Sequence, residues 1–371
     1  MVEPFSLAID AMGGDRAPEV VLDGLVIAAE RHPGARFLLV GDEAQLRPMM
    51  ATRKRIGDCC TVRHTSAVIP SEMKPTAALR VRGSSMRLAI DAVAAGEAHG
   101  VVSAGNTGAL LALAKIVIKT LPGIDRPAMA AIGPSARGDV VMLDLGANVQ
   151  CDARNLVQFA IMGAAYARIA NGLASPRVRL LNIGTEETKG TDDLRDAAAL
   201  LKQVDATLAL TFDGFIEADK ISRGDVDVVV TDGFSGNIAL KAMEGAARFV
   251  TDLLRRSFSS SLRSKFGFLI SRPATELLRH RLDPNNHNGA LFVGLNGIVV
   301  KSHGSASPRG VAHAIEITAR LLEENLTERI AADLADVGAE KIQTPVRQSP
   351  ARALARANQP VEEITGSESD A

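Results

Sequence analysis

The sequence predicts an α/β protein with a largely parallel sheet, and two observations carry this prediction. Six strand-like apolar runs alternate with longer segments of helical spacing, such as 155–171 and 192–203. The runs lie at residues 7–10, 36–40, 100–103, 140–145, 178–183 and 226–231. Most of these runs are continuously apolar rather than alternating in polarity, as is typical of strands that helices cover on both faces. Right-handed crossover connections follow from a sheet of this kind.

Composition excludes several classes of function. The chain has 371 residues, of which 46% are hydrophobic and 23% are charged, as in a soluble enzyme with one large domain or two modest ones. A formal net charge of -1, no tryptophan and one tyrosine argue against a nucleic-acid partner. The three cysteines, Cys59, Cys60 and Cys151, form no metal-spaced set and are too few for a disulfide framework, which favours a reducing compartment.

The sequence predicts neither a leader peptide nor a membrane span. A strand begins at Phe5 with Glu3 just ahead of it, unlike the start of a signal peptide. The longest apolar stretch, 109–121, contains Lys115 and Lys119 and is too short to cross a bilayer. We therefore expect a cytoplasmic protein that at most lies on a membrane surface.

A helical hairpin is predicted over about residues 238–283. Its first helix runs over about 237–258 and has one apolar face, made of Leu240, Met243, Ala247, Val250 and Leu254. The segment 257–270 follows, and Pro273 separates it from a second helical stretch over about 274–282. The pattern predicts an element that leaves the sheet and returns to it.

The last part of the chain returns to the sheet and then changes composition. Strand-like runs occur at 290–293 and 297–301. Residues 341–371 are rich in Pro, Arg, Gln, Ser and Glu, which is typical of a disordered tail. We therefore expect a single domain over 1–340, followed by this tail.

Three glycine-containing loops share one form, in which each follows an apolar run and opens a helix-like stretch. They lie at residues 103–108, 144–148 and 232–237. Glycine lets the backbone approach a ligand, and the free amides at a helix start favour an anion. We expect these loops to meet at one edge of the sheet and form a concave, phosphate-sized site.

Each loop motif also has a purely structural interpretation. A helix cap needs one Ser, Thr or Asn, whereas the 103–108 loop has Ser103, Asn106 and Thr107, which favours binding. The first loop places Asp10 and Asp15 near a possible ligand, but it also fits a simple strand-to-helix turn with a proline at the helix start. The sequence leaves these two interpretations of the first loop equally open.

Two further side chains are candidates for chemistry. Lys189, in the loop 184–190, is the only fixed positive charge that we find in these strand-end loops, and it suits phosphate or a developing oxyanion. A solvated surface lysine is an equally good interpretation. His303 ends a late apolar strand and could be a general acid or base. A histidine there is slightly more often a hydrogen-bonding residue of the structure.

The predicted hairpin carries an apolar tip surrounded by basic residues. The apolar residues are Leu262, Phe266, Phe268, Leu269 and Ile270, and the basic ones are Arg255, Arg256, Arg263, Lys265, Arg272, Arg279 and Arg281. Apolar residues rimmed by cations suit an anionic membrane surface or an acidic protein partner. Packing into a homodimer is the alternative, and for the apolar face of the first helix we favour it.

Nine segments of the chain, in this order, resemble the phosphate acyltransferase family called PlsX. They are AIDAMGGD (8–15), SAGNTGA (103–109), GIDRPA (123–128), DLGAN (144–148), SPRV (175–178), NIGTE (182–186), KG (189–190), TDGFSGN (231–237) and SHGS (302–305). One such segment would be weak evidence, but this number in order is highly specific. The resemblance extends over about residues 6–330.

This resemblance implies both a reaction and an architecture. The family makes acyl phosphate from acyl-(acyl carrier protein) and inorganic phosphate, without a cofactor. It has a three-layer α/β/α fold like that of phosphotransacetylase or isopropylmalate dehydrogenase, works as a homodimer, and associates peripherally with membranes. The implied product would reach a membrane glycerol-3-phosphate acyltransferase, indirectly or transiently, for phospholipid synthesis.

The resemblance also implies roles for residues of this sequence. It implicates Lys189 and Asn237 in catalysis, and we expect Asp232 or His303 to orient them. The glycine loops and Asp10 would line the phosphate and thioester pocket. This selects Asp10, Gly13, Gly14, Asp15, Ser103, Gly105, Asn106, Thr107, Gly108, Asn148, Thr185, Gly233 and Gly236.

The expected mechanism is direct attack by a phosphate oxygen on the thioester carbonyl. Phosphate is largely anionic near pH 7, so its capture and alignment and the stabilisation of the oxyanion matter more than a strong base. Lys189 would bind phosphate or the oxyanion, while Asn237 and Asn106 would donate hydrogen bonds. The lack of a Gly-x-Ser-x-Gly nucleophile elbow agrees with this hypothesis.

Two departures from the family pattern and two rival functions stay open. Residues 214–219 read GFIEAD where many members read GNVEGR, and residue 288 is Asn where Gly is usual. One rival is a nicotinamide-dependent decarboxylating dehydrogenase, which would need clustered acidic metal ligands and an adenine site. The other is a membrane-surface scaffold for lipid synthesis, which would use the basic, phenylalanine-rich tip and not the glycine loops.

Overall fold

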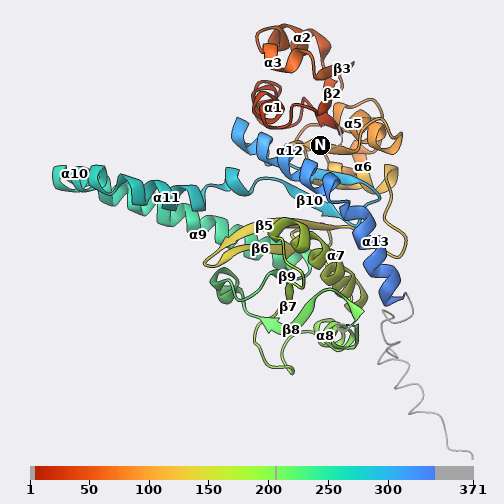
Figure 1. Cartoon of the computed structure of the whole chain (residues 1–371), viewed down its shortest axis with the longest axis vertical. Coiled ribbons are helices and arrows are strands. Elements are labelled where there is room, and N and C mark those ends of the chain that lie inside the picture. Colours follow the sequence, from red (N-terminus) through yellow and green to blue (C-terminus); the bar gives the residue numbers. More distant parts are fainter. Residues whose placement is uncertain (1–4, 205–206, 339–371) are drawn as a thin grey trace, which may run out of the picture.

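The computed structural model describes residues 5–204 and 207–338. Within these residues eleven strands form one sheet in the order β3-β2-β1-β4-β11-β10-β5-β6-β9-β7-β8 (Figure 1). The strands are β1 (Ser6–Asp10), β2 (Arg36–Gly41), β3 (Cys60–His64), β4 (Gly100–Ser103), β5 (Ala128–Ser135), β6 (Gly138–Leu143), β7 (Arg177–Leu181), β8 (Thr211–Ile216), β9 (Val228–Val230), β10 (Ala290–Val293) and β11 (Ile298–Lys301). All the strand-like runs of the sequence lie on these strands, so the largely parallel sheet is confirmed.

The sheet consists of two parallel halves that run in opposite directions. Strands β3, β2, β1, β4 and β11 are parallel to one another, and so are β6, β9, β7 and β8. Between the halves, three antiparallel pairings, β11 with β10, β10 with β5 and β5 with β6, reverse the strand direction. The loops therefore do not all meet at one edge, and that expectation was wrong. The carboxyl ends of the two halves lie at opposite edges.

Helices cover both faces of the sheet, which confirms the three-layer α/β/α architecture. One face carries α1 (Glu19–Arg31), α2 (Glu43–Ala51), α3 (Lys54–Gly57), α7 (Ala153–Asn171), α8 (Asp192–Val204), α12 (Pro308–Glu323) and α13 (Leu326–Val337). On the other face, α4 (Pro75–Ala78), α5 (Ser85–Ala94) and α6 (Thr107–Val117) cover the first half, while η2 (Ala218–Arg223) and the start of α9 cover the second half. Met129 of β5 packs against both of these smaller clusters, at the junction between them.

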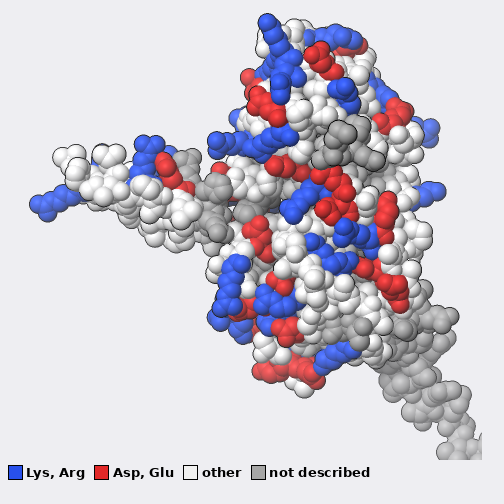
Figure 2. Space-filling model, in the orientation of Figure 1, with Lys and Arg blue, Asp and Glu red and all other residues white. Residues whose placement is uncertain are grey.

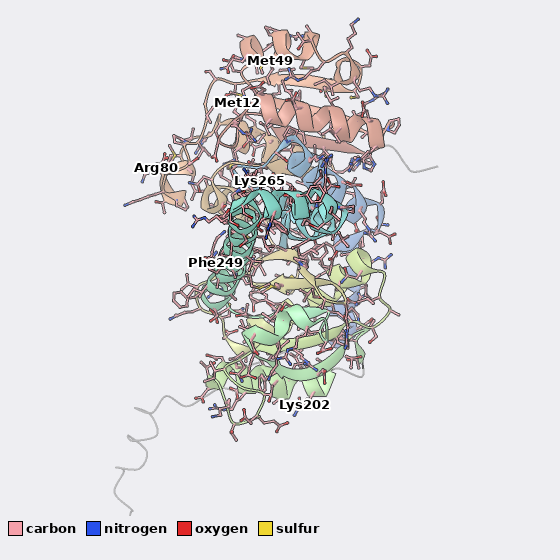
Figure 3. All side chains as sticks on the ribbon, turned by 90° about the vertical axis from the view of Figure 1, so that its left-hand side faces the viewer. Met12, Met49, Arg80, Lys202, Phe249 and Lys265 are labelled. Carbon is pink, nitrogen blue, oxygen red and sulfur yellow. The ribbon has the colours of Figure 1, made fainter. Side chains whose placement is uncertain are left out.

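A helical arm leaves the body of the molecule and returns to it (Figure 1). It consists of α9 (Gly233–Ser259), α10 (Leu262–Ile270) and α11 (Arg272–Leu282), and the short η3 (Pro284–His287) leads back to β10. The predicted hairpin is therefore present. Pro273 lies in the first turn of α11, where the missing N–H is not needed. Figure 3 looks toward the arm, with Phe249 on α9 and Lys265 on α10.

Two further expectations concern the tail and membrane-spanning helices. The predicted tail over 341–371 lies outside the described residues. Among the residues that are described, no helix is long and apolar enough to span a bilayer.

Candidate active site

A large cleft opens on the face of the sheet that carries α6 and α9. Its volume is about 1100 Å³, and it lies between the start of α9 and the middle of the sheet. Residues of β5, β6 and α9 form an apolar wall, made of Met129, Ala131, Ile132, Met142, Leu145, Leu240, Met243 and Ala247. Polar side chains border it as well, including Thr107, Asn237, Asn288, Lys301, Ser302 and His303. Loops from both halves of the sheet therefore reach one cleft, although they come from opposite edges.

Three adjacent parallel strands of the first half end in polar residues that are in register. Asp10 of β1 pairs with Ser103 of β4, which in turn pairs with Lys301 of β11. Asp10 is only 2% exposed, and the Ser103 hydroxyl donates to its carboxylate at 2.6 Å. Burial raises the pKa of Asp10, and the hydrogen bond from Ser103 opposes this shift. Through this hydrogen bond, Asp10 supports Ser103 and the loop that follows β4.

Two glycine loops approach each other closely in front of Asp10. A Cβ on Gly13 would come within 2.6 Å of the Asp10 carboxylate and 2.7 Å of the Gly105 amide nitrogen. Gly14 has a φ of 109°, a conformation that favours glycine. The exposed Asp15 uses its backbone N–H to donate to the Gly304 carbonyl at 2.9 Å. These contacts hold the first loop against the loops that follow β4 and β11.

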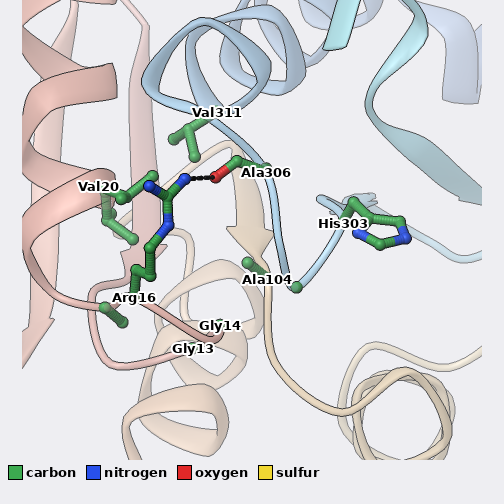
Figure 4. A pocket seen from close by; sticks show the side chains of 11 residues that line it. Gly13, Gly14, Arg16, Val20, Ala104, His303, Ala306 and Val311 are labelled. Atoms are coloured by element: carbon green, nitrogen blue, oxygen red, sulfur yellow. Dashed lines mark hydrogen bonds between the residues drawn. The ribbon is translucent and has the colours of Figure 1, made fainter. Parts of the chain in front are cut away.

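A small pocket lies beside this contact (Figure 4). Arg16 donates to the Ala306 carbonyl at 3.0 Å on one side of it, and His303 lies on the other side. Pro18 is the N-cap residue of α1, so the strand-to-helix turn considered for the first loop is also present. The loop is thus a turn whose glycines face other loops.

The Asn106 side chain acts as a helix cap. Its oxygen accepts from the Ala109 N–H at 2.9 Å, and its amide group donates to the Ser71 and Met73 carbonyls. A direct bond from this side chain to a substrate would require one of these bonds to break. Thr107 lines the cleft, whereas a Cβ on Gly108 would meet Pro75 at 2.9 Å.

Lys301 is a functional candidate that the sequence analysis missed. It closes β11, is 9% exposed and lines the cleft. Its ammonium group donates to the Ala104 carbonyl at 3.3 Å and to the Ser302 carbonyl. Burial lowers the pKa of Lys301 to about 8, while Asp10 and Asp15 oppose this shift. The sequence signal was a lysine at the end of the apolar run 298–301.

His303 follows Lys301 and is held from two sides. Its backbone N–H donates to the Asn288 side chain at 2.8 Å, so the departure at residue 288 has a structural use. The Nδ1 atom accepts from the Ser305 N–H at 3.2 Å. Burial, and then Lys301, lower the pKa of His303. The neutral ring therefore carries its proton on Nε2, which makes that nitrogen a hydrogen-bond donor.

In the second half of the sheet, Asp144 organises the loop that follows β6. The side chain is fully buried and accepts from the backbone N–H groups of Gly146, Ala147 and Asn148 at 2.7–3.1 Å. The Asn148 amide donates to Asp144 and to the Pro127 carbonyl, so both of its hydrogens are used within the protein. Asn148 therefore supports this loop, and its side chain has no free donor in the described structure.

The loop 232–237 packs directly onto the Asp144 loop. Asp232 caps α9 and accepts from the Ser235 N–H and hydroxyl, both at 2.8 Å. The Gly233 N–H donates to the Asn148 carbonyl at 2.7 Å, and a Cβ on Gly236 would lie 1.9 Å from the Asp144 carbonyl oxygen. Only glycine permits these two contacts. Asp232 therefore shapes the start of α9, the helix that carries Asn237.

Asn237 differs from Asn106 and Asn148 in its hydrogen bonding. Its amide donates to the Leu145 carbonyl at 3.0 Å, and the side chain lines the cleft. No other bond from this amide is found within the described part of the chain. Of the three asparagines, Asn237 thus keeps one amide hydrogen for a ligand.

Lys189 and Thr185 lie in the loop after β7, and both are exposed. The Lys189 side chain packs over Gly184, where an added Cβ would be 3.1 Å from the lysine Cγ. Its backbone is fixed, since the Lys189 carbonyl accepts from Asn182 at 3.2 Å. Because β7 is the neighbour of β9, this loop and Asn237 lie at the same sheet edge. Neither Lys189 nor Thr185 borders the cleft.

Two of the three cysteines have thiols that burial makes harder to ionise. Burial raises the pKa of Cys60 and raises that of Cys151 to about 12, so both thiols are protonated near neutral pH and are poor nucleophiles. In the described ranges, no group of three His, Cys, Asp or Glu residues is arranged to hold a metal ion.

The tip of the arm is defined by Leu262, Arg263, Lys265, Phe266, Phe268, Leu269 and Ile270, all of which are exposed. Phe266 is 65% exposed and Phe268 is 42% exposed. Figure 2 shows the outer part of the arm as mostly uncharged surface with basic groups at its far end. The sequence prediction of an accessible apolar tip with cations is confirmed for this single chain.

Comparison with known proteins adds a family and a fold. A family model described as fatty acid synthesis protein matches residues 5–329. The chain is 62% identical over 334 residues to a phosphate acyltransferase of Erythrobacter litoralis (strain HTCC2594), over 90% of this chain and 94% of the relative. It is 58% identical over 335 residues to a phosphate acyltransferase of Gluconobacter oxydans (strain 621H), over 90% of each.

Solved structures share the architecture at low sequence identity. EutD phosphotransacetylase from Staphylococcus aureus matches with a TM-score of 0.56 and 17% identity, over 86% of this chain and 95% of that one. A phosphotransacetylase from Streptococcus pyogenes matches with a TM-score of 0.56 and 20% identity, over 86% and 94%. At such identities the likeness shows the fold alone, and it confirms the expected phosphotransacetylase-like architecture.

Proposed function

The chain belongs to the fatty acid synthesis protein family of phosphate acyltransferases, and from this premise we propose that its substrates are acyl-(acyl carrier protein) and inorganic phosphate. The products are acyl phosphate and free carrier protein, and the acyl phosphate supplies membrane phospholipid synthesis. Enzymes of this kind transfer an acyl group to phosphate. The rival dehydrogenase and scaffold functions do not account for this family membership.

One observation carries the proposal, namely the division of the cleft into apolar and polar parts. Apolar side chains of β5, β6 and α9 form one wall, which suits an acyl chain. Lys301, His303 and Asn237 border the same cleft with donor groups. A fatty acyl chain would pack against the apolar wall with its thioester near these donors.

The proposed reaction needs no group beyond the two substrates. An oxygen of HPO₄²⁻ forms a bond to the thioester carbonyl carbon, and the carbon–sulfur bond breaks. The carrier thiol leaves with the proton that the phosphate brought, so acyl phosphate and free thiol are the only products. Donors fixed around the carbonyl oxygen stabilise the negative charge of the tetrahedral intermediate.

We assign the roles in this reaction as follows. Asn237 donates its remaining amide hydrogen to the carbonyl oxygen, and the Nε2–H of His303 is a second donor. Lys189 approaches from its exposed loop at the edge next to Asn237 and supplies positive charge. The buried Asp10 and Asp144, together with the half-buried Asp232, hold loops that surround the cleft.

The arm is proposed to bring the enzyme to its lipid partners. Its exposed apolar tip with Arg263 and Lys265 suits an anionic membrane surface, where a membrane acyltransferase would take up the product. We further propose that the enzyme is a cytoplasmic homodimer. The predicted apolar face of α9 does not form this interface as a whole, because its Leu240, Met243 and Ala247 line the cleft. We assign the exposed Phe249 and Leu253, on another side of the same helix, to the interface instead.

The test is a thiol-release assay on the purified protein with long-chain acyl-(acyl carrier protein), with and without inorganic phosphate. We expect release of the carrier thiol only when phosphate is present, with formation of acyl phosphate and no need for a divalent metal. Thiol release that does not depend on phosphate, or no release at all, would overturn the proposal.

A further inference from the structure

We infer that Lys301 is a second cationic group of the acyl-transfer site and that it binds the phosphate substrate through its ammonium group. This inference rests on the proposed function and deepens it, because it identifies where phosphate is held. The sequence analysis assigned fixed positive charge in the strand-end loops to Lys189 alone. The structure places another lysine at the end of β11, inside the cleft.

Lys301 buries a positive charge in the wall of the cleft. Lys301 is 9% exposed, and within the described residues no carboxylate lies at ion-pair distance from its Nζ atom. Its partners are the backbone carbonyls of Ala104 and Ser302. Burying an ammonium group is unfavourable unless it is paired, so such a residue calls for an anion.

The nearest acidic residue along the sheet does not supply that anion. Asp10 is in register with Ser103, and Ser103 with Lys301, so Asp10 lies two strands away. At a strand spacing of about 4.8 Å, the two backbones are separated by roughly 10 Å. The Asp10 carboxylate accepts from Ser103 instead, and Asp10 and the exposed Asp15 act on Lys301 only through longer-range charge interactions.

The hydrogen bonds of the Lys301 ammonium group leave one of its donors free for a ligand. An ammonium group has three N–H donors, and two of them go to the carbonyls of Ala104 and Ser302. These two bonds fix the side chain and leave the third donor for a ligand in the cleft that Lys301 lines. A fixed ammonium of this kind is a suitable point charge for a phosphate oxygen.

Other hydrogen-bond donors share the cleft with Lys301. His303 presents its Nε2–H donor from the same loop, Thr107 presents the start of the eleven-residue helix α6, and Asn237 comes from the other half of the sheet. The N-terminus of a helix adds a positive dipole end that also favours an anion. Phosphate bound between Lys301 and α6 would therefore face a thioester held near Asn237.

A comparison with Lys189 strengthens the assignment. Lys189 is exposed, so its ammonium group stays hydrated until a substrate covers it. Lys301 is already desolvated and held by two carbonyl groups. Lys301 therefore binds phosphate, while Lys189 stabilises the negative charge that develops on the carbonyl oxygen during the attack.

The experiment measures the KM for phosphate and kcat separately for the Lys301→Met and Lys301→Arg variants. Methionine keeps an unbranched chain without charge, and arginine keeps the charge. The matched control is Lys54→Met, because Lys54 is exposed on α3, on the opposite face of the sheet. Binding of inorganic phosphate alone is followed by ³¹P line broadening, and folding by thermal unfolding.

We expect Lys301→Met to raise the KM for phosphate at least tenfold, to remove the line broadening, and to keep a cooperative unfolding transition. Lys301→Arg should recover part of the affinity, and Lys54→Met should match the parent enzyme. A KM for phosphate within twofold of the parent value, or a fall in kcat alone, would overturn the inference. Failure of the unsubstituted enzyme to release thiol with phosphate would instead refute the proposed reaction, so the two failures are distinct.

Discussion

Two lysines follow apolar strands in opposite halves of the sheet, and their surroundings differ sharply. Lys301 ends β11, is buried, and has its ammonium group fixed by two carbonyls. Lys189 belongs to an exposed loop after β7, and its side chain lies over Gly184. A buried lysine has its solvation and geometry set before substrate arrives, whereas an exposed one must lose water when substrate binds. The same residue type is thus suited to two different tasks.

The loops around these lysines differ in the same way. In the first half, Asp10, with a raised pKa, supports Ser103 and the glycine loops. In the second half, Asp144 accepts four backbone N–H bonds and one side-chain bond, and Gly236 packs against its carbonyl group. The second half is therefore built around tight backbone contacts that position Asn237. The first half is built around two buried titratable groups, Asp10 and Lys301.

The largest effect is expected from Lys189→Ala. Loss of one group that stabilises the oxyanion typically lowers the rate about a hundred- to a thousand-fold, and we expect a fall of that size in kcat. The measurement is the rate of phosphate-dependent thiol release at saturating phosphate. Near-normal turnover would remove Lys189 from the mechanism and leave Lys301 as the only lysine assigned to it. Lys54→Ala, with an exposed lysine of α3, is the control.

The next effect tests the tight contacts of the second half. In Gly236→Ala the added methyl group would meet the Asp144 carbonyl oxygen at 1.9 Å, so the loops that carry Asp144 and Asn237 must separate. We expect at least a tenfold fall in kcat and a loss of about 1–3 kcal/mol of unfolding free energy.

Gly245→Ala is the matched control for this substitution. Gly245 lies on the same helix α9, and an added Cβ would find nothing within 4 Å. Because alanine is the better helix former, we expect unchanged activity and a gain of up to about 1 kcal/mol. Equal behaviour of the two variants would show that the close packing of α9 on the Asp144 loop is dispensable.

Much of this organisation was predicted from the sequence, for identifiable physical reasons. Continuous apolar runs mark strands that are covered on both faces, and a glycine with polar neighbours at the end of such a run marks a close loop. These signals located the loops that contain Ser103, Asp144 and Asn237. The long helix after Asn237 followed from its single apolar face. All of these features depend on residues that are near one another in the chain.

What could not be predicted depends on contacts between distant residues. The direction of a strand is set by the strand it pairs with, and nothing in the apolar run 128–132 of β5 shows that both of its partners are antiparallel to it. The burial of Lys301 depends on the loops around it, which include Ala104. The same holds for Asn106 and Asn148, whose donors are used by other loops. A sequence shows which side chains carry hydrogen-bond donors, but it does not show whether other parts of the chain already use those donors.

A smaller effect is expected from pH, through Lys301. The folded-state pKa of about 8 lies below the ordinary value of 10.5, so Lys301 loses its charge as pH rises above 8. Phosphate affinity should then fall with increasing pH, and Lys301→Arg should keep it. The charged or titratable groups around Lys301 are Asp10, Asp15 and His303, with Lys241 and Glu244 on the facing side of α9. A KM for phosphate that is flat from pH 7 to pH 9.5 would contradict this.

The same pKa shift predicts a change in stability. Between pH 8 and pH 10.5 the unfolded chain binds more protons at Lys301 than the folded chain, so the unfolding free energy should rise with pH in this window. At pH 7 the buried charge is unfavourable by up to about 3 kcal/mol, at about 1.4 kcal/mol per pKa unit. Lys301→Met should therefore be more stable than the parent at pH 7 while binding phosphate less well. Urea unfolding at pH 7 and pH 10 measures both effects.

The smallest effect on turnover is expected at the tip of the arm, far from both lysines. The double substitution Phe266→Asp with Phe268→Asp replaces two exposed apolar side chains by charges that anionic lipid repels, so vesicle binding should be lost while thiol release in solution stays unchanged. Co-sedimentation with anionic vesicles measures the first property. Ile116→Asp, at an exposed position of α6 outside the arm, is the control and should keep vesicle binding. Unchanged vesicle binding by the double variant would instead assign the tip to an interface between copies of the chain.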